Sequence, residues 1–507
     1  MPLRDPFPPP TPRATALAML VAAAATAAIT WWLGAAHGWL PLTHDEQAYV
    51  LQARLLAAGR LVGPAPPLPD FFQQFHVLVT PVLAPKYPLG HGLVLVPGVW
   101  AGWLPLMPLV LAAVAAALLT WLVTVTTRSL AAAGLAVLLW LQAPAVQWNA
   151  PGYFSEATST AAWLGALAAA WAWDRQGRIR WALLAGALLG LCAITRPFVA
   201  LGAGLPLAGW ALREAARRGR LAHAAFALAA AVPALGLVGL QHRAATGSWF
   251  ALPATAYART YFPHDVPGFG ARDGASTRPL LPDHRRYDDE YRAIHAAHTV
   301  GRLPTTIAER ARFLLRDAYG EGRARWALLA FAGLGTLLGP PAFRLALLAA
   351  AGQFVAYLGF GHRPDWTLYQ LEQMPLAAAL AAAGIGIVLG QAGAWRLGGA
   401  AVASLLAFTL WDATRTRGEM GHQMAARQRA FERAVASVPA PAIVFVRYAP
   451  WHNFNRALVE NAPDWRTAPR WLVHDLGTRN AELLARFPER RAFRYDEATR
   501  RIAPLPG

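Results

Sequence analysis

The chain has 507 residues, of which 56% are hydrophobic and 15% are charged, and its mean hydropathy is +0.31. In soluble domains roughly a quarter of the residues are charged, so this composition excludes a cytosolic enzyme, and a single cysteine excludes a disulfide scaffold. The net charge of +18 does not indicate a nucleic-acid partner, because membrane proteins collect arginine in cytoplasmic loops beside anionic lipid headgroups. We expect an all-α polytopic membrane protein, since lipid offers no partners for unpaired backbone groups.

Apolar runs that could cross a bilayer recur over the first 411 residues. A helical crossing needs about 20 residues, with some variation for tilt. The runs predict about 11 crossings, at 14–35, 92–127, 130–143, 154–173, 181–195, 197–212, 221–242, 325–339, 343–360, 367–390 and 395–411. The run at 92–127 is long and contains Pro105 and Pro108. We interpret the first run as a retained anchor, because no clear cleavage site follows it.

Arginines lie mostly in one set of the connections between these runs. That set holds Arg128, Arg175, Arg178, Arg180, Arg213, Arg217, Arg218, Arg220, Arg344 and Arg396, and the opposite short connections hold only Arg196 and Arg363. Because basic residues stay inside, the first set and the N-terminus are expected in the cytoplasm. The sequence thus predicts a multi-pass membrane protein with a cytoplasmic N-terminus and an extracytoplasmic C-terminal segment.

Three long polar segments follow from this topology. Residues 1–411 are expected to form the transmembrane domain with outer loops at 36–91 and 243–324, and residues 412–507 a small α/β domain. In that domain, β-branched and aromatic content indicates strands. We expect strands at Ala442–Tyr448, Arg470–His474 and Arg491–Tyr495, and a helix at Arg479–Phe487.

The first outer loop opens with the acidic pair Asp45 and Glu46. If a helix begins here, Asp45, Tyr49 and Gln52 share one face. Two adjacent acids at a membrane surface can supply a general base and a group that orients it or holds a cation. The alternative is structural: Thr43 and Glu46 have the spacing of a capping box, and acids in a first turn suit the helix dipole.

Lys86 is the only lysine in the chain and lies in the stretch Pro85–Gly92, just before an apolar run. Lysine is a good point charge for phosphate, prolines stiffen the backbone, and glycines let a ligand approach closely. The alternative is that Lys86 extends toward the interface beside Tyr87 as a belt aromatic.

Glu156 lies in the first turn of a later apolar run, at its outer edge. A carboxylate there is costly unless it is paired or used, although dipole compensation is an alternative. The predicted crossings otherwise hold few charges away from their ends, which argues against an ion or proton pathway. In the second outer loop, the charged run 284–291 is expected to be a solvated surface.

These features in this order resemble the polytopic GT-C glycosyltransferases, a group that includes protein O-mannosyltransferases and lipid A aminoarabinose transferases. The resemblance covers roughly residues 14–411. The residues that carry it are Asp45, Glu46 and Tyr49, then Lys86–Gly90, then Glu156, then Ala193–Pro197, with Tyr257 and Gly361–Pro364 as further matching stretches. Aminoarabinose transferases have an acid directly before the loop lysine, where this chain has Pro85, so the chain looks closer to an uncharacterised bacterial branch.

The resemblance implies an enzyme that takes a hexose or pentose from a polyprenyl-phosphate carrier and passes it to an acceptor hydroxyl with inversion. It implies that Asp45 is the general base, with Glu46 and Glu156 as further acidic residues that pair with it or help hold a divalent metal. Whether a metal is used stays open. The implied substrate-binding residues are Lys86, Tyr49, Tyr87, Arg196, Arg259, His362 and Arg363.

Two other functions remain as alternatives. An O-antigen ligase or polymerase also has many crossings and a basic outer loop, but it would leave the first-loop acidic pair unexplained. A lipid-linked oligosaccharide flippase or other transporter would show two similar halves and polar groups at mid-membrane, and the sequence has neither. The expected partners are a lipid-linked sugar donor, membrane lipids and an unspecified acceptor, which is a protein, a lipid or a glycan.

Overall fold

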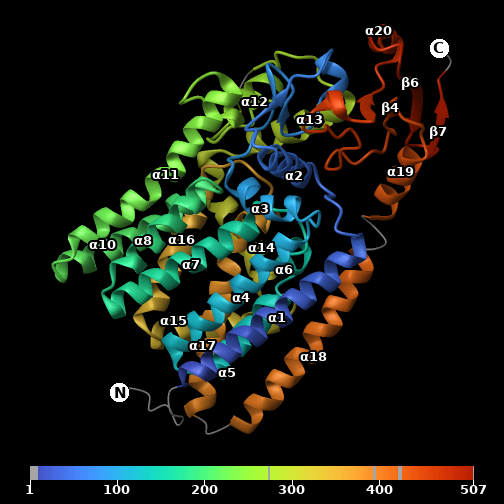
Figure 1. Cartoon of the computed structure of the whole chain (residues 1–507). Helices are drawn as coiled ribbons and strands as arrows, with labels where there is room; N and C mark the ends of the chain where they lie inside the picture. The colour runs from blue at the N-terminus through green and yellow to red at the C-terminus, as the bar shows by residue number, and fades with distance from the viewer. Residues whose placement is uncertain (1–9, 272–273, 392–394, 421–424, 506–507) are drawn as a thin grey trace. The chain divides into compact units, whose positions relative to one another are not determined.

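The computed structural model describes residues 10–271, 274–391, 395–420 and 425–505 (Figure 1). The chain divides into two compact units. The first, which we call the helical unit, comprises Met1–Ala35, Pro105–Gly236 and Val300–Gly418. The second, the mixed unit, comprises Ala36–Leu104, Leu237–Thr299 and Glu419–Gly507, and thus joins parts of all three predicted outer segments.

Helices make up the helical unit, some of them continuing past its boundaries. They are α1 Pro12–His37, α4 Leu106–Thr127, α5 Leu130–Gln142, α6 Pro144–Asn149, α7 Ser155–Gln176, α8 Ile179–Ala193, α9 Pro197–Gly202, α10 Gly204–Arg217, α11 Leu221–Thr246, α14 Leu303–Tyr319, α15 Ala324–Leu338, α16 Pro341–Leu358, the 3-10 helix η3 Thr367–Gln373, α17 Met374–Gln391 and α18 Trp395–Met420. Among the described residues, five helical segments are long and apolar enough to cross a bilayer, namely α1, α4, α11, α16 and Thr367–Leu389.

The apolar runs predicted from the sequence are helical, with three differences. The long run at 92–127 forms two helices, α3 (Gly90–Trp100) and α4, because Gly102 and Pro105 interrupt it. The run at 197–212 is divided into α9 and α10. Helix α18 continues to Met420, past the predicted end at residue 411. Four shorter apolar helices, α3, α5, α8 and α15, accompany the five long ones.

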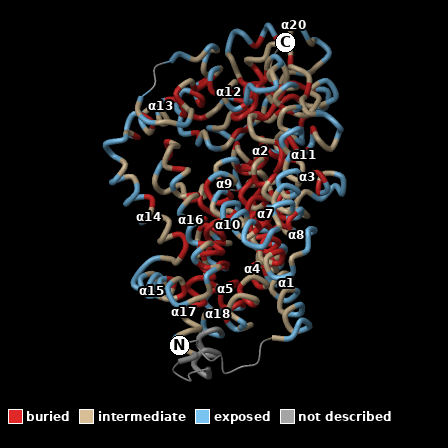
Figure 2. The backbone as a smooth tube through the Cα atoms, turned by 90° about the vertical axis from the view of Figure 1, so that its left-hand side faces the viewer, coloured by how far each residue is buried: buried red, intermediate tan, exposed pale blue. Residues whose placement is uncertain are grey.

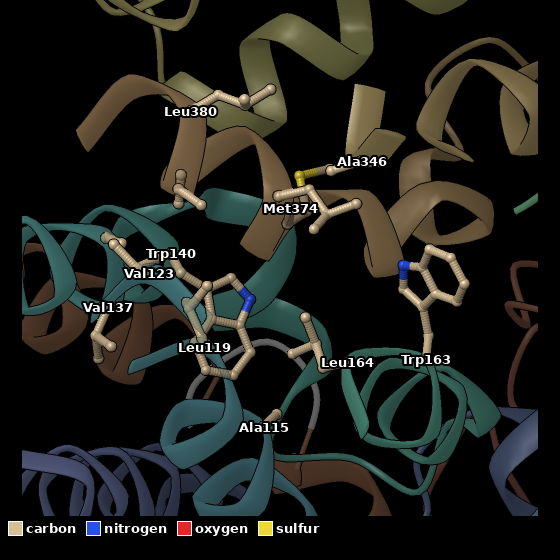
Figure 3. Close-up of a cluster of buried hydrophobic side chains, with 14 of the residues drawn as sticks. Ala115, Leu119, Val123, Val137, Trp140, Trp163, Leu164, Ala346, Met374 and Leu380 are labelled. Atoms are coloured by element: carbon tan, nitrogen blue, oxygen red, sulfur yellow. The ribbon is translucent and has the colours of Figure 1, made fainter. Parts of the chain in front are cut away.

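Alanine and glycine let the helices of this unit approach closely. A Cβ on Gly384 of α17 would collide with the carbonyl of Phe331 on α15, and one on Gly335 of α15 with the carbonyl of Leu380. Small residues at crossing points are typical of helix packing in membranes. Larger side chains fill the remaining core, and Figure 3 shows Leu119 of α4, Trp140 of α5 and Leu164 of α7 pointing toward one another.

Apolar side chains are also exposed along these helices. Leu17 and Leu20 on α1 and Phe226 and Leu228 on α11 are each at least half exposed. Figure 2 shows exposed residues along much of the helical unit. Water would penalise such patches, whereas lipid tails accommodate them. The exposed faces therefore agree with a multi-pass membrane protein.

Short elements from distant parts of the chain form the mixed unit. Helix α2 (His44–Ala57) is followed by three strands, β1 Gly63–Pro64, β2 Val77–Leu78 and β3 Val82–Pro85, in the antiparallel order β1-β3-β2. The sequence did not predict this sheet, because strands of two to four residues have no readable periodicity. The second loop contributes α12 (Pro253–Tyr261) and α13 (Pro282–Ala297).

The C-terminal part of the mixed unit contains the four-stranded sheet β5-β4-β6-β7. Strand β4 (Ala442–Arg447) is central and pairs in parallel with β5 (Arg470–His474) and β6 (Arg491–Asp496). The three predicted strands and the helix α20 (Asn480–Arg486) are confirmed, whereas β7 (Arg501–Pro504) and α19 (Ala426–Ala436) were not predicted. Phe71 and Phe72 of the first loop are buried against β4 and β5, so loop and sheet share a core.

Candidate active site

The first turn of α2 is fixed by a capping box. Thr43 Oγ1 accepts the backbone N–H of Glu46, and Glu46 Oε2 accepts the backbone N–H groups of Leu42 and Thr43, both at 3.0 Å. Glu46 is 3% exposed. The capping box that the sequence offered as an alternative is confirmed. The Glu46 carboxylate therefore holds the helix start, with the Thr43 hydroxyl also 3.2 Å from its Oε2, and the neighbouring Asp45 side chain faces a different set of groups.

Tyr87 contacts the predicted face of α2 at three successive positions. Its hydroxyl donates to Asp45 Oδ1, and its ring stacks on Tyr49 with centroids 4.5 Å apart and planes at 23°. Its carbonyl accepts from Gln52 Nε2 at 2.9 Å. The prediction that Asp45, Tyr49 and Gln52 share a face is thus confirmed, and one tyrosine fixes that face.

Two histidines complete the surroundings of Asp45. His44 Nδ1 lies 3.0 Å from Asp45 Oδ2, and His76 Nε2 lies 3.6 Å from Asp45 Oδ1. The Asp45 side chain is 35% exposed, whereas both histidines are buried. Burial raises the pKa of Asp45, but the nearby His44 and His76 and the Tyr87 hydroxyl outweigh it and hold that pKa below its ordinary value. Asp45 is therefore a carboxylate at neutral pH.

Lys86 lies at the end of β3, on the same side as these groups. Its backbone N–H donates to the His76 carbonyl at 2.8 Å, and its Nζ lies 5.4 Å from the Tyr87 ring centroid and 5.2 Å from that of Tyr257. No carboxylate oxygen of the described residues lies within 4.0 Å of Nζ. Burial lowers the pKa of Lys86, against the opposing charges of Asp265 and Asp45. The ammonium thus rests on aromatic faces and not in a direct ion pair.

Asp265 and Tyr257 belong to this cluster and come from the second loop. The Tyr257 hydroxyl accepts the backbone N–H of His76 at 2.9 Å. Asp265 Oδ2 accepts from the Tyr287 hydroxyl at 3.2 Å. Burial raises the pKa of Asp265, but the hydrogen bond from His295 and the charge of Lys86 bring it below its ordinary value. The sequence had pointed to Tyr257 only through the family resemblance, and no spacing signal pointed to Asp265 or His76.

Helix α13 corrects the prediction of a solvated surface at 284–291. His284, Tyr287 and Asp288 are buried, and the His284 ring stacks on Phe75 with centroids 4.1 Å apart. Only the opposite face of the helix, which includes Arg285 and Asp289, is exposed. In a half-buried helix, residues three or four positions apart face inward. The many charged residues of this run made that spacing hard to recognise in the sequence.

Three residues of this cluster could hold a metal ion. The ligand atoms of His44, Asp45 and His76 all lie within 4.8 Å of one another. His44 Nε2 and His76 Nδ1 are buried and have no hydrogen-bond partner among the described residues, while His44 Nδ1 already lies beside Asp45, so the set fits a cation. Two imidazoles and one carboxylate suit zinc or a similar transition metal better than magnesium, which prefers oxygen ligands. The Glu46 carboxylate is already hydrogen-bonded in the capping box.

Glu156 and Arg196 form a second polar cluster, inside the helical unit. Glu156, in the first turn of α7, makes an ion pair with Arg196, whose Nε also lies 3.1 Å from Glu372 Oε1 of η3. Arg196 Nη2 donates to the Tyr357 hydroxyl at 2.8 Å. All four side chains are buried. Two carboxylates thus share one guanidinium, and the sequence did not point to Glu372.

The remaining predicted site residues make other contacts, although the His362 ring lies 4.6 Å from that of Tyr369, a ring that the Arg196 guanidinium also approaches, at 5.8 Å. Arg363 is half exposed and pairs with Asp365, at 3.0 Å. His362 is buried, with Nδ1 2.8 Å from the Arg363 carbonyl oxygen. Both belong to the helical unit, as do Glu156 and Arg196. Arg259 belongs to the mixed unit and is exposed on α12.

A largely apolar cavity of about 540 Å³ lies within the helical unit. Its lining includes Leu111, Trp140 and Leu371, with the carboxylate residue Glu156 at one side. Glu156 is ion-paired with Arg196, and the other polar lining residues, Thr26, Thr30, Asn149 and Thr160, are uncharged. Its walls suit a hydrocarbon chain.

No protein-family model and no curated protein sequence matches the chain. Solved structures do resemble it. ArnT from Cupriavidus metallidurans bound to undecaprenyl phosphate superposes with a TM-score of 0.52 at 14% identity, over 94% of this chain and 92% of that chain. The same protein in the apo state gives 0.47 at 15% identity, over 94% and 93%. An oligosaccharyltransferase from Archaeoglobus fulgidus gives 0.45 at 12% identity, over 85% of this chain and 62% of that one.

The likeness to undecaprenyl-phosphate-bound ArnT extends over nearly the whole of both chains, so it concerns the complete architecture and not a single helix bundle. It shows that the chain has the GT-C membrane glycosyltransferase fold that the order of sequence features predicted.

Proposed function

We propose that this protein is a membrane glycosyltransferase. It takes a sugar from a polyprenyl-phosphate carrier and transfers it, with inversion, to an acceptor hydroxyl on the outer face of the bacterial cytoplasmic membrane. One observation carries the proposal: a carboxylate and a cation 41 positions apart in the chain both contact Tyr87, since Asp45 accepts its hydroxyl and the Lys86 ammonium lies 5.4 Å from its ring centroid.

Lys86 serves the leaving group. As the bond between the anomeric carbon and the phosphate oxygen breaks, its electron pair passes to the lipid phosphate, and negative charge collects there. A fixed cation that has no direct carboxylate partner among the described residues can stabilise this charge. The phosphate is already a good leaving group, so the site needs no strong general acid.

Asp45 serves the acceptor. Its oxygen accepts the hydroxyl proton while the acceptor oxygen bonds to the anomeric carbon. A carboxylate with a lowered pKa is a weak base, but the hydroxyl becomes strongly acidic once the new bond forms, so proton transfer late in the step suits it. Tyr87 and His76 hold the carboxylate in place until then.

If the cluster binds a divalent transition metal, then His44, Asp45 and His76 are the residues that hold it, and the ion supplies positive charge beside the acceptor oxygen. Lys86 and Tyr257 keep the same role toward the phosphate in both cases.

The carrier is an isoprenoid chain, and the apolar cavity of the helical unit supports this choice. Leucine and alanine side chains with Trp140 make up much of its wall, a surface that suits a hydrocarbon chain. The solved structure with the highest TM-score quoted above contains undecaprenyl phosphate, a lipid of this chemical class. The arginine distribution supports a cytoplasmic N-terminus and a periplasmic C-terminal region.

The proposal is tested with membranes that contain the full chain and with radiolabelled polyprenyl-phosphate sugars. Wild type and the Asp289→Asn variant, whose exposed carboxylate lies away from the cluster, are expected to transfer label to an acceptor fraction. Asp45→Asn is expected to lose transfer by about a hundredfold or more. Absence of transfer from every donor by wild type, or equal transfer by Asp45→Asn, would overturn the proposal.

A further inference from the structure

The C-terminal part of the mixed unit contains a second hollow, which the proposed reaction does not use. It has a volume of about 430 Å³, and its lining comes from α19, the loop at residues 450–458 and the β6–β7 hairpin. Three arginines line it, Arg427, Arg456 and Arg500, against a single carboxylate, Glu497. None of the three lies within 4.0 Å of a carboxylate oxygen of the described residues, so the hollow carries uncompensated positive charge.

Two buried polar atoms in the wall have no partner among the described residues. His452 is 6% exposed, and its Nδ1 lies 2.9 Å from Glu497 Oε1, which leaves Nε2 without a hydrogen bond. Arg456 Nε is also buried without a partner. Buried polar atoms normally find partners, so these two indicate a polar ligand. The two Glu497 oxygens already accept from Ala449 N–H and lie beside His452 Nδ1, both at 2.9 Å, and no hydrogen bond joins Glu497 to Arg456 among the described residues.

An aromatic surface lies at the rim of this hollow. Trp451 is 49% exposed, and the Arg427 guanidinium lies 4.9 Å from its ring centroid. A half-exposed indole with a cation above it offers an apolar face beside a positive charge. Asn453, at the same rim, offers an amide that both donates and accepts. A sugar ring has an apolar face and hydroxyl edges, and a carboxylate or phosphate on it would match the arginines.

The hollow is joined to the candidate active site by a short stretch of backbone. The loop that supplies Trp451, His452 and Arg456 also supplies the Asn455 carbonyl, which accepts the backbone N–H of His44 at 3.0 Å. Gln47 Nε2 donates to the Ala457 carbonyl at 2.8 Å. The loop therefore contacts the first turn of α2 on both sides of Asp45.

A second link runs through α13. Arg286 donates to the carbonyl of His452 at 3.1 Å and also to that of Pro450. The next residue, Tyr287, donates to Asp265 of the candidate active site. The loop that forms part of the hollow is thus hydrogen-bonded both to α2, which carries Asp45, and to α13, whose Tyr287 donates to Asp265.

We propose that this hollow binds a negatively charged sugar residue of the acceptor, one that bears a carboxylate or a phosphate. The identification of this sugar as part of the acceptor rests on the proposed function, whereas binding of the sugar can be measured without turnover. The arginines form ion pairs with the anion, the Trp451 ring packs against the sugar ring, and His452 and Asn453 form hydrogen bonds with its hydroxyl groups. The acceptor is then held by the loop that contacts the base-bearing helix.

The test uses the purified full chain in nanodiscs and measures binding of glucuronate, glucose 6-phosphate, glucose and inorganic phosphate by calorimetry. We expect one or both anionic sugars to bind, and glucose and phosphate to bind at least about tenfold more weakly. Arg456→Gln, Arg427→Gln and Trp451→Ala should each weaken anionic-sugar binding about tenfold or more. Arg466→Gln, an exposed arginine paired with Asp464 outside the hollow, is the matched control and should bind normally.

Several results would overturn the inference. One is that neither anionic sugar binds, and another is that the control and hollow variants bind alike. A third is that inorganic phosphate binds as tightly as glucose 6-phosphate, which would make the hollow a simple anion site. A fourth is that vesicles of anionic phospholipid, and not sugars, respond to Arg427→Gln. Arg427 is exposed, so its variant is informative even if Arg456→Gln fails to fold.

Failure of the proposed function gives a different pattern. Asp45→Asn should bind the anionic sugar as wild type does. If binding depends on the hollow but wild type transfers no sugar from any donor, the proposed function fails and the binding site stands. If transfer proceeds and the hollow variants leave the acceptor KM unchanged, the inference fails and the proposed function stands. The inference predicts a rise in acceptor KM of about tenfold with little change in kcat.

Discussion

Asp45 and Glu46 are adjacent acids with different surroundings. Glu46 accepts two backbone N–H groups and is buried, whereas Asp45 is part exposed and meets Tyr87 and two histidines. A group that transfers a proton must reach the solvent-accessible side of the site, and only Asp45 does so. We therefore propose separate roles for the two neighbours, a structural one for Glu46 and a chemical one for Asp45.

The proposed role of Lys86 in binding the carrier phosphate can be tested by measuring the affinity of Lys86 variants for the carrier. Lys86→Gln removes the charge and is expected to weaken binding of a sugar-free polyprenyl phosphate by about ten- to a hundredfold, the usual worth of a charge-assisted contact. Lys86→Arg keeps the charge and should recover most of the affinity. Equilibrium binding to protein in nanodiscs measures both. Unchanged affinity in Lys86→Gln would contradict the role.

The two shifted pKa values set the pH range of activity. The active form needs Asp45 ionised and Lys86 protonated. The pKa of Asp45 lies below its ordinary value, although burial opposes this, so activity should stay level down to about pH 5. Burial lowers the pKa of Lys86, so activity should fall on the alkaline side before the ordinary lysine value of about 10.4.

The profile of kcat/KM against pH measures these limbs, and Lys86→Arg is the control. An arginine stays charged throughout, so the variant should lose the alkaline fall or move it to higher pH. If the alkaline fall in activity is unchanged in Lys86→Arg, then a group other than Lys86 causes it.

Some of this site could be predicted from residue order and some could not. Asp45, Tyr49 and Lys86 have local signals, namely helix-face spacing and the rarity of lysine. His76, Asp265 and Glu372 have none, because a lone histidine or acid in a loop or helix end looks like an ordinary surface residue. Long-range packing, such as the contact between His76 and Tyr257, brings them to their partners.

The stability of the N-terminus of helix α2 depends on its capping box. Thr43→Ala or Glu46→Gln should lower the stability of this helix start by about 1 kcal/mol, and activity should fall only moderately because Asp45 keeps its partners. Thermal unfolding and transfer assays on the same preparations measure the two effects. A loss in Glu46→Gln as complete as that in Asp45→Asn, with unchanged unfolding temperature, would instead place Glu46 in the chemistry.

The elements that the sequence predicted are those with a strong local pattern. Apolar helices and the β-branched strand β4 follow directly from composition and periodicity. The three short strands of the first loop, the edge strand β7 and the buried face of α13 do not, because they are brief or rich in charge. Their structure is set by the partners that they meet.

Topology can be tested on the whole molecule, because the only native cysteine, Cys192, is buried. A cysteine at the exposed position Thr478 should react with an impermeant thiol reagent in intact cells. One at the exposed position Ala216, among the arginines that are predicted to be cytoplasmic, should react only after the membrane is opened. Labelling in the reverse order would contradict the orientation.

The GT-C fold follows from sequence order, but the grouping of segments does not. The order of crossings, first-loop acids and loop lysine led to the fold that the likeness to ArnT shows. Residues 36–104, 237–299 and 419–507 form one compact unit through contacts over hundreds of positions, such as Gln47 with Ala457. Side-chain patterns along one strand or helix contain no record of such contacts.

A single-turnover experiment tests the central claim most directly. Purified wild type and Asp45→Asn are loaded with the same labelled polyprenyl-phosphate sugar, donor occupancy is measured, and acceptor is then added. We predict equal occupancy and a rate of sugar transfer at least about a hundredfold lower in Asp45→Asn. Equal occupancy with an equal rate would contradict the assignment of Asp45 as the base, and with it the proposed mechanism.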